Sequence, residues 1–426
     1  MSVTRDEVLQ LILRQLSAYG YPSLSQAVAT HTKVQMTAES SSRLEELVSM
    51  GLRSERQQRA SDALSEEPRT AEATGEEVVE DTESTEAGLD NDLDLDRRVP
   101  AVVPYYKVWY KTKHKGAATA AAFSADGRYI ATGSADSSLK LIEVDRVRNP
   151  AAGSARREDK PVIRTLYNHE AGITGMAFHP NGLVLASCST DHTVKLFDLS
   201  AAYGKYAFQS TSDNYAFYSI SFHPSGEYLA AATDASEVRL LNVRTSKTYL
   251  LRAGSAPNTD QHSAGLTHVA YAGSGAMITS TSRDGCVKLW DGRSGTCVRT
   301  LDHAHGGAPT TAALFSRSSR YLLTTGLDSA VRLWDVAAAR VVNSYEGATM
   351  DAFDARAVFS HDETLVMVPD ARTNSIACWD TASARLLKRC ADHKARVTCV
   401  AASPITSALM SCSVDECVRY WSPDDS

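Results

Sequence analysis

The chain has 426 residues, of which 43% are hydrophobic and 22% are charged, and it carries a formal net charge of −7. This mixture is typical of globular proteins, and no stretch of about 18 apolar residues predicts a membrane span. None of the eight cysteines forms a C-x-x-C pair, and most lie in apolar runs, so we expect reduced buried thiols rather than a zinc site or a disulfide framework.

Residues 1–61 are predicted to form a small helical domain. Thr4 and Glu7 form a capping box at the start of the first helix, and Pro22 follows its end. Helices this short bury little apolar surface alone, so we expect the domain to pair with a second copy. The apolar face predicted to carry this dimerisation consists of Leu9, Ile12, Leu13, Leu16 and Tyr21. The alternative is that the helices pack against the rest of the chain. The segment AYGYPSLSQAV resembles a LisH-like dimerising element.

An acidic linker is predicted over residues 62–98. Residues 62–96 contain 14 Asp or Glu and one Arg, a net charge of −13, so the rest of the chain carries +6. A run of this charge without aromatic residues cannot bury enough apolar surface to order itself. We therefore expect a disordered spacer, with a specific binding tail as the alternative.

From residue 99 to residue 426 the sequence repeats one pattern. An apolar strand, a turn with Pro or Gly, and a second strand precede an Asp turn; a third strand then ends in an aromatic or large apolar residue, and a more variable strand follows. Six of these aspartates are evident, and a diverged seventh copy is placed between residues 357 and 380. The turn aspartates are Asp136, Asp191, Asp234, Asp284, Asp328, Asp370 and Asp415.

Four short strands at a period of about 40 to 45 residues resemble the WD-repeat family, and the LFD, LWD and CWD endings of the third strands carry this resemblance. It implies an all-β propeller of seven blades over residues 99–426. The last copy lacks an outer strand, whereas residues 105–114 form a strand without a blade. We expect this strand to complete blade seven, because the pairing leaves no open edge at the closure.

Polar residues recur at fixed offsets within the copies. A His precedes the first strand, a Ser stands two residues before the turn Asp, and an aromatic residue stands six after it. These types suit a buried hydrogen-bonded chain, with Ser and Asp predicted to hold the two ring nitrogens of His. The predicted members are His114, Ser134, Asp136, His169, Ser189, Asp191, His262, Ser282, Asp284, Trp290, Asp328, Trp334, His393, Ser413, Asp415 and Trp421. Blades three and six carry Asp213 and Met350 at the His position and lack the full chain.

His, Ser and Asp together also suggest a hydrolase triad. A catalytic nucleophile occurs once, however, whereas this set recurs in most copies. No P-loop, H-E-x-x-H or G-x-S-x-G motif is present. We therefore expect no enzyme, no cofactor and no metal site.

Several phrases resemble the WD-repeat subunits of cleavage stimulation factor, which serve pre-mRNA 3′-end cleavage and polyadenylation. They are KPVIRTLYNHEAGITGMAFHPN, SISFHPSGEYL, TSRDGCVKLWDGRSGTCVRT, AHGGAP and VFSHDETLVMVPDARTNSIACWD. The resemblance implies a nuclear, non-enzymatic scaffold that dimerises through its N-terminus and binds the helical-repeat subunit of that factor. An RRM-bearing subunit would supply contact with pre-mRNA. The excursion before residue 160 also matches an insertion in that family, and it offers Arg156 and Arg157 as a candidate partner loop.

Other functions are disfavoured by particular features. Residues 97–426 carry only +5, too little for a strong phosphate footprint, so direct RNA binding by this chain is not expected. A LisH and propeller adaptor of another kind, such as a dynein regulator or a ubiquitin-ligase substrate receptor, is the main alternative. A dynein regulator would carry heptads after its helices, whereas the linker holds Pro68, Gly75 and Gly88.

Overall fold

The computed structural model describes residues 95, 101–148, 161–200, 205–251 and 261–423. The chain divides into two units, Met1–Ala87 and Gly88–Ser426, and all the described residues belong to the second. The helical domain predicted over residues 1–61 and nearly all of the acidic linker predicted over residues 62–98 lie outside the described residues.

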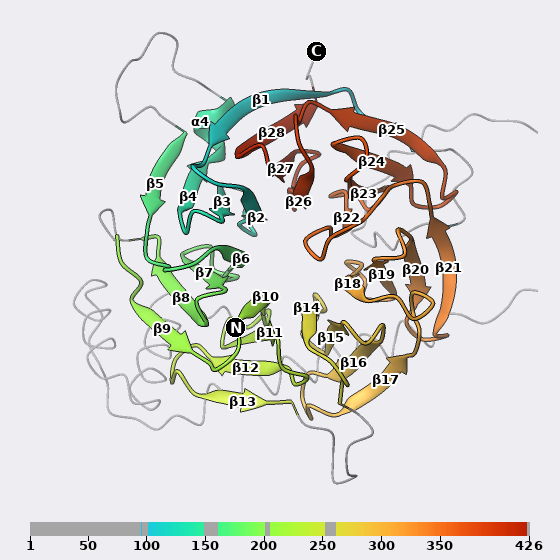
Figure 1. Cartoon of the computed structure of the whole chain (residues 1–426), viewed down its shortest axis with the longest axis horizontal. Coiled ribbons are helices and arrows are strands. Elements are labelled where there is room, and N and C mark those ends of the chain that lie inside the picture. Colours follow the sequence, from blue (N-terminus) through green and yellow to red (C-terminus); the bar gives the residue numbers. More distant parts are fainter. Residues whose placement is uncertain (1–94, 96–100, 149–160, 201–204, 252–260, 424–426) are drawn as a thin grey trace, which may run out of the picture. The chain divides into compact units, whose positions relative to one another are not determined.

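The strands of the described residues form seven antiparallel sheets of four strands, arranged as blades in a ring (Figure 1). In each blade the strands follow one another from the centre of the ring outward. The first three blades consist of β2 (Ala118–Phe123), β3 (Tyr129–Ser134), β4 (Leu139–Glu143) and β5 (Val162–Leu166); β6 (Ile173–Phe178), β7 (Val184–Ser189), β8 (Thr193–Asp198) and β9 (Gln209–Ser212); and β10 (Phe217–Phe222), β11 (Tyr228–Thr233), β12 (Arg239–Asn242) and β13 (Thr248–Leu250).

The remaining blades repeat this plan, and a one-turn helix, α4 (Val144–Arg148), follows β4. Blades four to six consist of β14 (Leu266–Tyr271), β15 (Met277–Ser282), β16 (Val287–Asp291) and β17 (Cys297–Leu301); β18 (Thr310–Phe315), β19 (Tyr321–Gly326), β20 (Val331–Asp335) and β21 (Arg340–Tyr345); and β22 (Val358–Phe359), β23 (Leu365–Asp370), β24 (Ser375–Asp380) and β25 (Leu386–Ala391). Blade seven consists of β26 (Val397–Ala402), β27 (Leu409–Ser413), β28 (Cys417–Pro423) and β1 (Tyr106–Lys113). The seven-bladed all-β propeller predicted from the repeats is confirmed.

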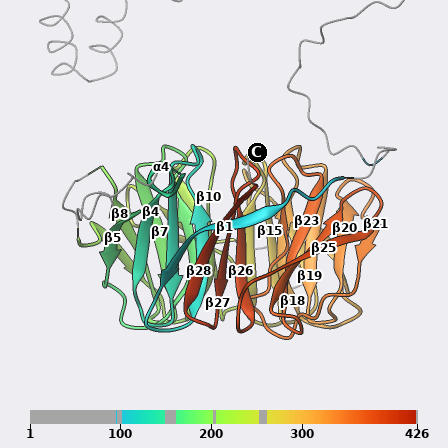
Figure 2. The same cartoon turned by 90° about the horizontal axis from the view of Figure 1, so that it is seen from above.

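Blade seven closes the ring with a strand from upstream of blade one, as the sequence predicts. β1 pairs antiparallel with β28 and runs along the outside of the ring (Figure 2). The pairing is interrupted by a bulge at Trp109. Before the bulge, Tyr106 packs in the apolar cluster shared with blade six; after it, Tyr110 packs in the cluster shared with blade one. The bulge thus lets one strand seal both sides of the closure.

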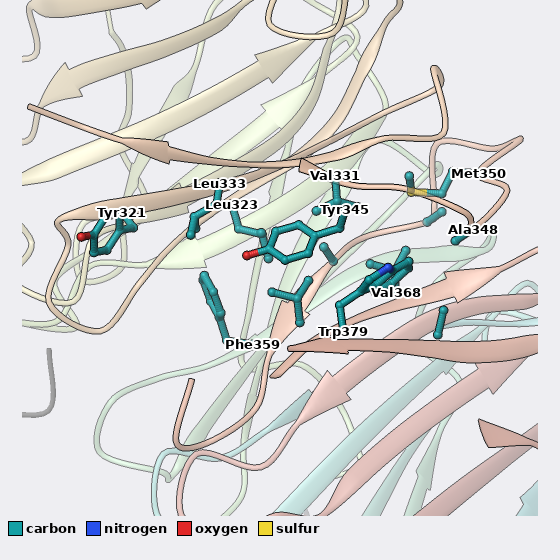
Figure 3. Close-up of a cluster of buried hydrophobic side chains, with 14 residues drawn as sticks. Tyr321, Leu323, Val331, Leu333, Tyr345, Ala348, Met350, Phe359, Val368 and Trp379 are labelled. Carbon is teal, nitrogen blue, oxygen red and sulfur yellow. The ribbon is translucent and has the colours of Figure 1, made fainter. Parts of the chain in front are cut away.

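The apolar cores lie between blades. Figure 3 shows the cluster between blades five and six, where Leu323 and Tyr345 pack against Val368 and Trp379. The Tyr345 hydroxyl donates a hydrogen bond to the Thr381 carbonyl at 2.8 Å. Each blade therefore buries both of its faces, which explains why the second strands are apolar or small at nearly every position.

Small residues in the second strands have a packing reason. A Cβ on Gly133 of β3 would lie 2.6 Å from the Ile173 side chain of blade two, so a larger residue there would push the blades apart. β11 carries three consecutive buried alanines, Ala230 to Ala232.

Candidate interaction site

Blade four contains a complete hydrogen-bonded chain across its strands. His262 Nδ1 donates to Asp284 at 2.9 Å, and Ser280 Oγ lies 2.8 Å from His262 Nε2. Trp290 Nε1 donates to the same Ser280 Oγ at 2.8 Å. The chain joins the loop before the innermost strand to the second and third strands, and its polar atoms are buried and satisfied.

The structure corrects the predicted serine. In blade four Ser282, two residues before Asp284, accepts from the Asp284 backbone N–H and donates to loop carbonyls rather than contacting the histidine. The hydroxyl that contacts His Nε2 belongs to the residue four positions before Asp. That position lies further from the Asp turn along the second strand, and its side chain faces the imidazole. The serines predicted as histidine partners but bonded elsewhere are Ser134, Ser189, Ser282 and Ser413. The hydroxyls that contact the histidines are Thr132, Ser187, Ser280, Thr324 and Ser411.

Blades five and seven contain the same chain with an arginine added. In blade seven His393 Nε2 contacts Ser411 at 2.7 Å, and Trp421 donates to that serine at 2.8 Å. The buried Arg419 donates to Asp415 at 3.0 Å and also contacts His393. In blade five the corresponding residues are His305, Asp328, Thr324, Trp334 and Arg332.

Blades one and two contain shorter versions. His169 Nδ1 donates to Asp191 at 2.7 Å, but Phe197 occupies the aromatic position and offers no N–H. In blade one the predicted His114–Asp136 hydrogen bond is absent. His114 Nδ1 bonds the Ser138 hydroxyl at 2.8 Å, and the Asp136 carboxylate stays 3.9 Å away. Ser138 fills the space between the two residues and is the closer partner.

These networks shift the pKa of their members. Burial, which exceeds the opposing effect of Asp191, lowers the pKa of His169. Burial alone would raise the pKa of Asp284, but hydrogen bonds from His262 and two backbone amides outweigh it and hold this pKa well below its usual range. Burial and the Arg419 charge lower the pKa of His393 to about 4. In blades two and seven, His169 and His393 are therefore neutral beside ionised Asp191 and Asp415.

The geometry of Ser187, His169 and Asp191 is that of a hydrolase triad, yet its serine is closed to solvent. Ser187 has no exposed surface, and neither does its counterpart Ser280 in blade four. Ser280 also accepts the tryptophan N–H, so its oxygen is fully used inside the blade. The arrangement stabilises the fold.

Blades three and six lack this chain. At the His position blade three has Asp213, which binds Arg239 at 2.8 Å, and blade six has the buried Met350. The turn aspartate of blade three, Asp234, is half-exposed and pairs with Arg283 at 3.0 Å. In blade six Asp370 pairs with Arg389 instead.

A second regular feature, missed from the sequence, links the blades around the central channel. A threonine near the start of the innermost strand donates to a backbone carbonyl of the next blade in five of seven cases. The donors are Thr119, Thr174, Thr267, Thr311 and Thr398, and the acceptors are the carbonyls of Ile173, Phe217, Thr310, Ala355 and Ala118. The sequence contains the pattern that could have predicted these contacts, a threonine four residues before the last residue of each of these five strands.

Tyr218 and Arg356 replace this threonine in blades three and six. Each is the next residue after one whose backbone carbonyl accepts the hydrogen bond from the threonine of the preceding blade. These carbonyls belong to Phe217 and Ala355, respectively. Arg356 Nη2 donates to the Tyr218 carbonyl at 3.0 Å, so the two exceptional blades are joined across the channel. Strands β10 and β22 lie on opposite sides of the centre in Figure 1.

A cavity of about 190 Å³ lies beside Tyr218 and Arg356, which both line it. Its lining combines threonines of the regular blades with charged and aromatic side chains. The lining residues are Thr119, Ile173, Thr174, Tyr218, Leu266, Thr267, Arg283, Phe353, Asp354 and Arg356. The last four come from the blade-four turn beside Asp284 and from the loop that leads into β22.

Other predicted residues lie outside the described part of the chain. They are Leu9, Ile12, Leu13, Leu16 and Tyr21 of the predicted dimerisation face, and Arg156 and Arg157 of the predicted partner loop. Within the described residues, no group of three or more His, Cys, Asp or Glu side chains could hold a metal ion. No helix of this part is long and apolar enough to cross a membrane.

Comparison with known proteins places the chain in a family. The model of the WD domain, G-beta repeat, matches residues 107–143, 160–198, 257–291, 295–335 and 384–422. Cleavage stimulation factor subunit 50 of Arabidopsis thaliana is 35% identical over 79% of this chain and 77% of its own length. The chain belongs to the cleavage stimulation factor subunit 50 family. The five matched repeats omit most of blades three and six, the blades that also lack the histidine and the threonine.

Two further relatives are more distant. Pre-mRNA-processing factor 19 homolog 2 of Arabidopsis thaliana is 26% identical over 42% of this chain and 31% of its own length. The crystal structure of the Myceliophteria thermophila Cps50 (Swd1) β-propeller domain superposes with a TM-score of 0.62 at 18% identity, covering 74% of this chain and 99% of that one. This likeness concerns the fold alone.

Proposed function

We propose that the chain is a non-enzymatic scaffold subunit of a cleavage stimulation factor complex, acting in the cleavage and polyadenylation of mRNA 3′ ends in the nucleus. The family membership carries this proposal. The burial of every Ser–His–Asp arrangement in the described blades supports a scaffold rather than an enzyme. A propeller with a closed ring offers a rigid surface on which loops bind partners.

The proposed partners are those that the resemblance to this family implies. The chain pairs with a second copy through residues 1–61 and holds the helical-repeat subunit of the factor. Pre-mRNA contact belongs to an RRM-bearing subunit. Arg419 and Arg239 of the described blades are buried and committed to internal contacts, so these two do not add to a cationic surface for RNA.

Affinity purification of the tagged full chain tests the assignment. The expected result is that a helical-repeat protein and an RRM protein copurify at stoichiometric amounts and that the eluate supports 3′-end cleavage. Recovery of ubiquitin-ligase or dynein subunits in their place would contradict it and favour an adaptor of another complex.

Light scattering of the full chain tests the dimer. The wild-type chain is expected at twice its monomer mass, and Leu13→Arg is expected to be monomeric because a buried unpaired charge is costly at an interface. Gln10→Arg, on the polar face of the same predicted helix, is the matched control and is expected to remain dimeric. A monomeric wild type would refute dimerisation.

A further inference from the structure

Arg356 occupies the place of a channel threonine, and its charge is not neutralised by any ion pair within the described residues. Its only hydrogen bond there is the one to the Tyr218 carbonyl. Its Nε is buried and has no hydrogen-bond partner. The nearest carboxylate along the chain, Asp354, is committed to Arg396, with a contact of 3.0 Å to Nη2. A buried guanidinium N–H without an acceptor is costly, so this site favours an external acceptor.

A second guanidinium adjoins the same cavity. Arg283 stacks on the rings of Tyr218 and Phe353, at 5.4 Å in each case, and its ion pair with Asp234 lies on the exposed side. Phe353 is 39% exposed and lines the same cavity. Arg283 and Phe353 together form a flat, partly apolar wall next to the free N–H of Arg356.

The apolar part of the cavity is provided by Ile173 and Leu266, both buried at the blade interfaces. A volume of about 190 Å³ is below the range of drug-sized ligand pockets and suits one or two side chains of an extended chain. The cavity therefore combines a place for an apolar group with a cationic wall.

We propose that this cavity binds an extended segment of a partner protein through one Asp or Glu side chain and an adjacent apolar side chain. The carboxylate accepts from Arg356 and faces Arg283, and the apolar neighbour packs on Phe353, Ile173 and Leu266. The proposal stands whichever complex the chain joins, so it goes beyond the function proposed above.

The flanking charges favour a single carboxylate over a polyanion. Asp354 lines the cavity and pairs with Arg396, and Asp234 pairs with Arg283 of the lining. A nucleic acid brings several phosphates and would place some of them against these carboxylates, whereas one carboxylate adds only a single negative charge beside them. The site therefore discriminates by the number of charges as well as by their sign.

The experiment selects ligands from a random peptide library displayed on phage, using the full-length chain as bait. Peptides recovered on the wild-type chain are expected to share an Asp or Glu next to an apolar residue. The most enriched peptide is then synthesised, and its affinity for each variant is measured by calorimetry. Replacing its acidic residue by the corresponding amide is expected to weaken binding at least about tenfold, the effect of losing one charged hydrogen bond.

Three variants of the cavity and one control complete the test. Arg356→Met is expected to weaken binding at least about tenfold, and Arg283→Met and Phe353→Ala, which change partly exposed side chains, to weaken it severalfold. Arg320→Met, at the far end of blade five where β18 leads into β19, is expected to bind as the wild type. If Arg356→Met fails to fold, the other two variants decide.

Selection of peptides without acidic residues, or equal affinity of the folded cavity variants, would overturn the proposal. So would Arg356-dependent binding of an oligouridine RNA in the absence of peptide binding. Failure of the purification described above, with peptide binding intact, would refute the proposed complex and leave this site standing.

Discussion

Blades four, five and seven differ from blades three and six in where their polar residues are used. In the first group His, Asp and a hydroxyl are bonded to one another inside the blade, and a channel threonine ties each blade to the next. In the second group both features are missing, and Tyr218 and Arg356 face the channel instead. We infer that the residues repeated in most blades stabilise the propeller, whereas their replacements Tyr218 and Arg356 mark the place where it binds a ligand.

The largest difference is expected between two turn aspartates at the same repeat position. Asp284→Ala in blade four is expected to lower the free energy of unfolding by about 1 to 3 kcal/mol, because it strands His262 and two backbone amides. Asp234→Ala in blade three is expected to cost less than about 0.5 kcal/mol, because its ion pair is exposed. Urea unfolding of both variants measures this, and equal costs would erase the distinction between the blades.

The pH dependence of stability sharpens the same comparison. Burial and Arg419 lower the pKa of His393 from 6.5 to about 4, while Asp415 and Asp392 act in the opposite direction. The folded state therefore disfavours the protonated imidazole of His393. The stabilisation is complete above about pH 6.5 and is lost as the pH falls towards 4, on the order of 1 kcal/mol or more for His393.

Unfolding midpoints of the wild type and of His393→Gln, measured across this window, check the point. The variant is expected to be less stable at neutral pH and to show a smaller decline on acidification. Met350, which stands in place of the histidine in blade six, has no ionisable group and adds nothing to this decline. Parallel curves for the two proteins would mean that His393 is already protonated in the fold.

A smaller difference is expected at the channel. Thr311→Val removes hydrogen bonds to Thr325 and to the Ala355 carbonyl, and is expected to cost about 1 kcal/mol. Tyr218→Phe removes only a partly exposed contact of 3.3 Å with Arg283 and is expected to change stability by a few tenths of a kcal/mol at most. Thermal unfolding of both variants compares them, and a larger loss in Tyr218→Phe would reverse the assignment.

The sequence was sufficient for the architecture because the strand pattern is local and repeats seven times. The turn aspartates, the third-strand aromatics and the missing outer strand of the last copy together determined the blade number and the closing role of Tyr106–Lys113. Even the exceptional blades were recognised, since Asp213 and Met350 stand out against the histidines.

The sequence did not reveal which of two serines faces the histidine. Ser280 and Ser282 are two residues apart and therefore lie on the same face of one strand. Only the position of the His262 imidazole along that strand decides which of them it contacts. Nor could it place Arg356, which reaches blade three from blade six across 138 positions of sequence. Such contacts depend on the closed ring and have no local signal. The sequence also does not predict the backbone of the Asp turns, because non-glycine residues that follow the aspartate, such as Ser329 and Glu416, adopt positive φ there.

The central claim is that Arg332, which belongs to a repeated hydrogen-bonded chain, stabilises the fold, whereas Arg356, which replaces a channel threonine, binds a ligand. Arg332 in blade five donates to Asp328 at 2.7 Å and to the Ala304 carbonyl at 3.1 Å, whereas Arg356 faces the cavity. The most direct test measures unfolding and acidic-peptide affinity together for Arg332→Met and Arg356→Met. We predict lowered stability with unchanged affinity for the first variant, and near-normal stability with at least about tenfold weaker affinity for the second. The reverse pattern, or equal effects of the two changes, would contradict the account.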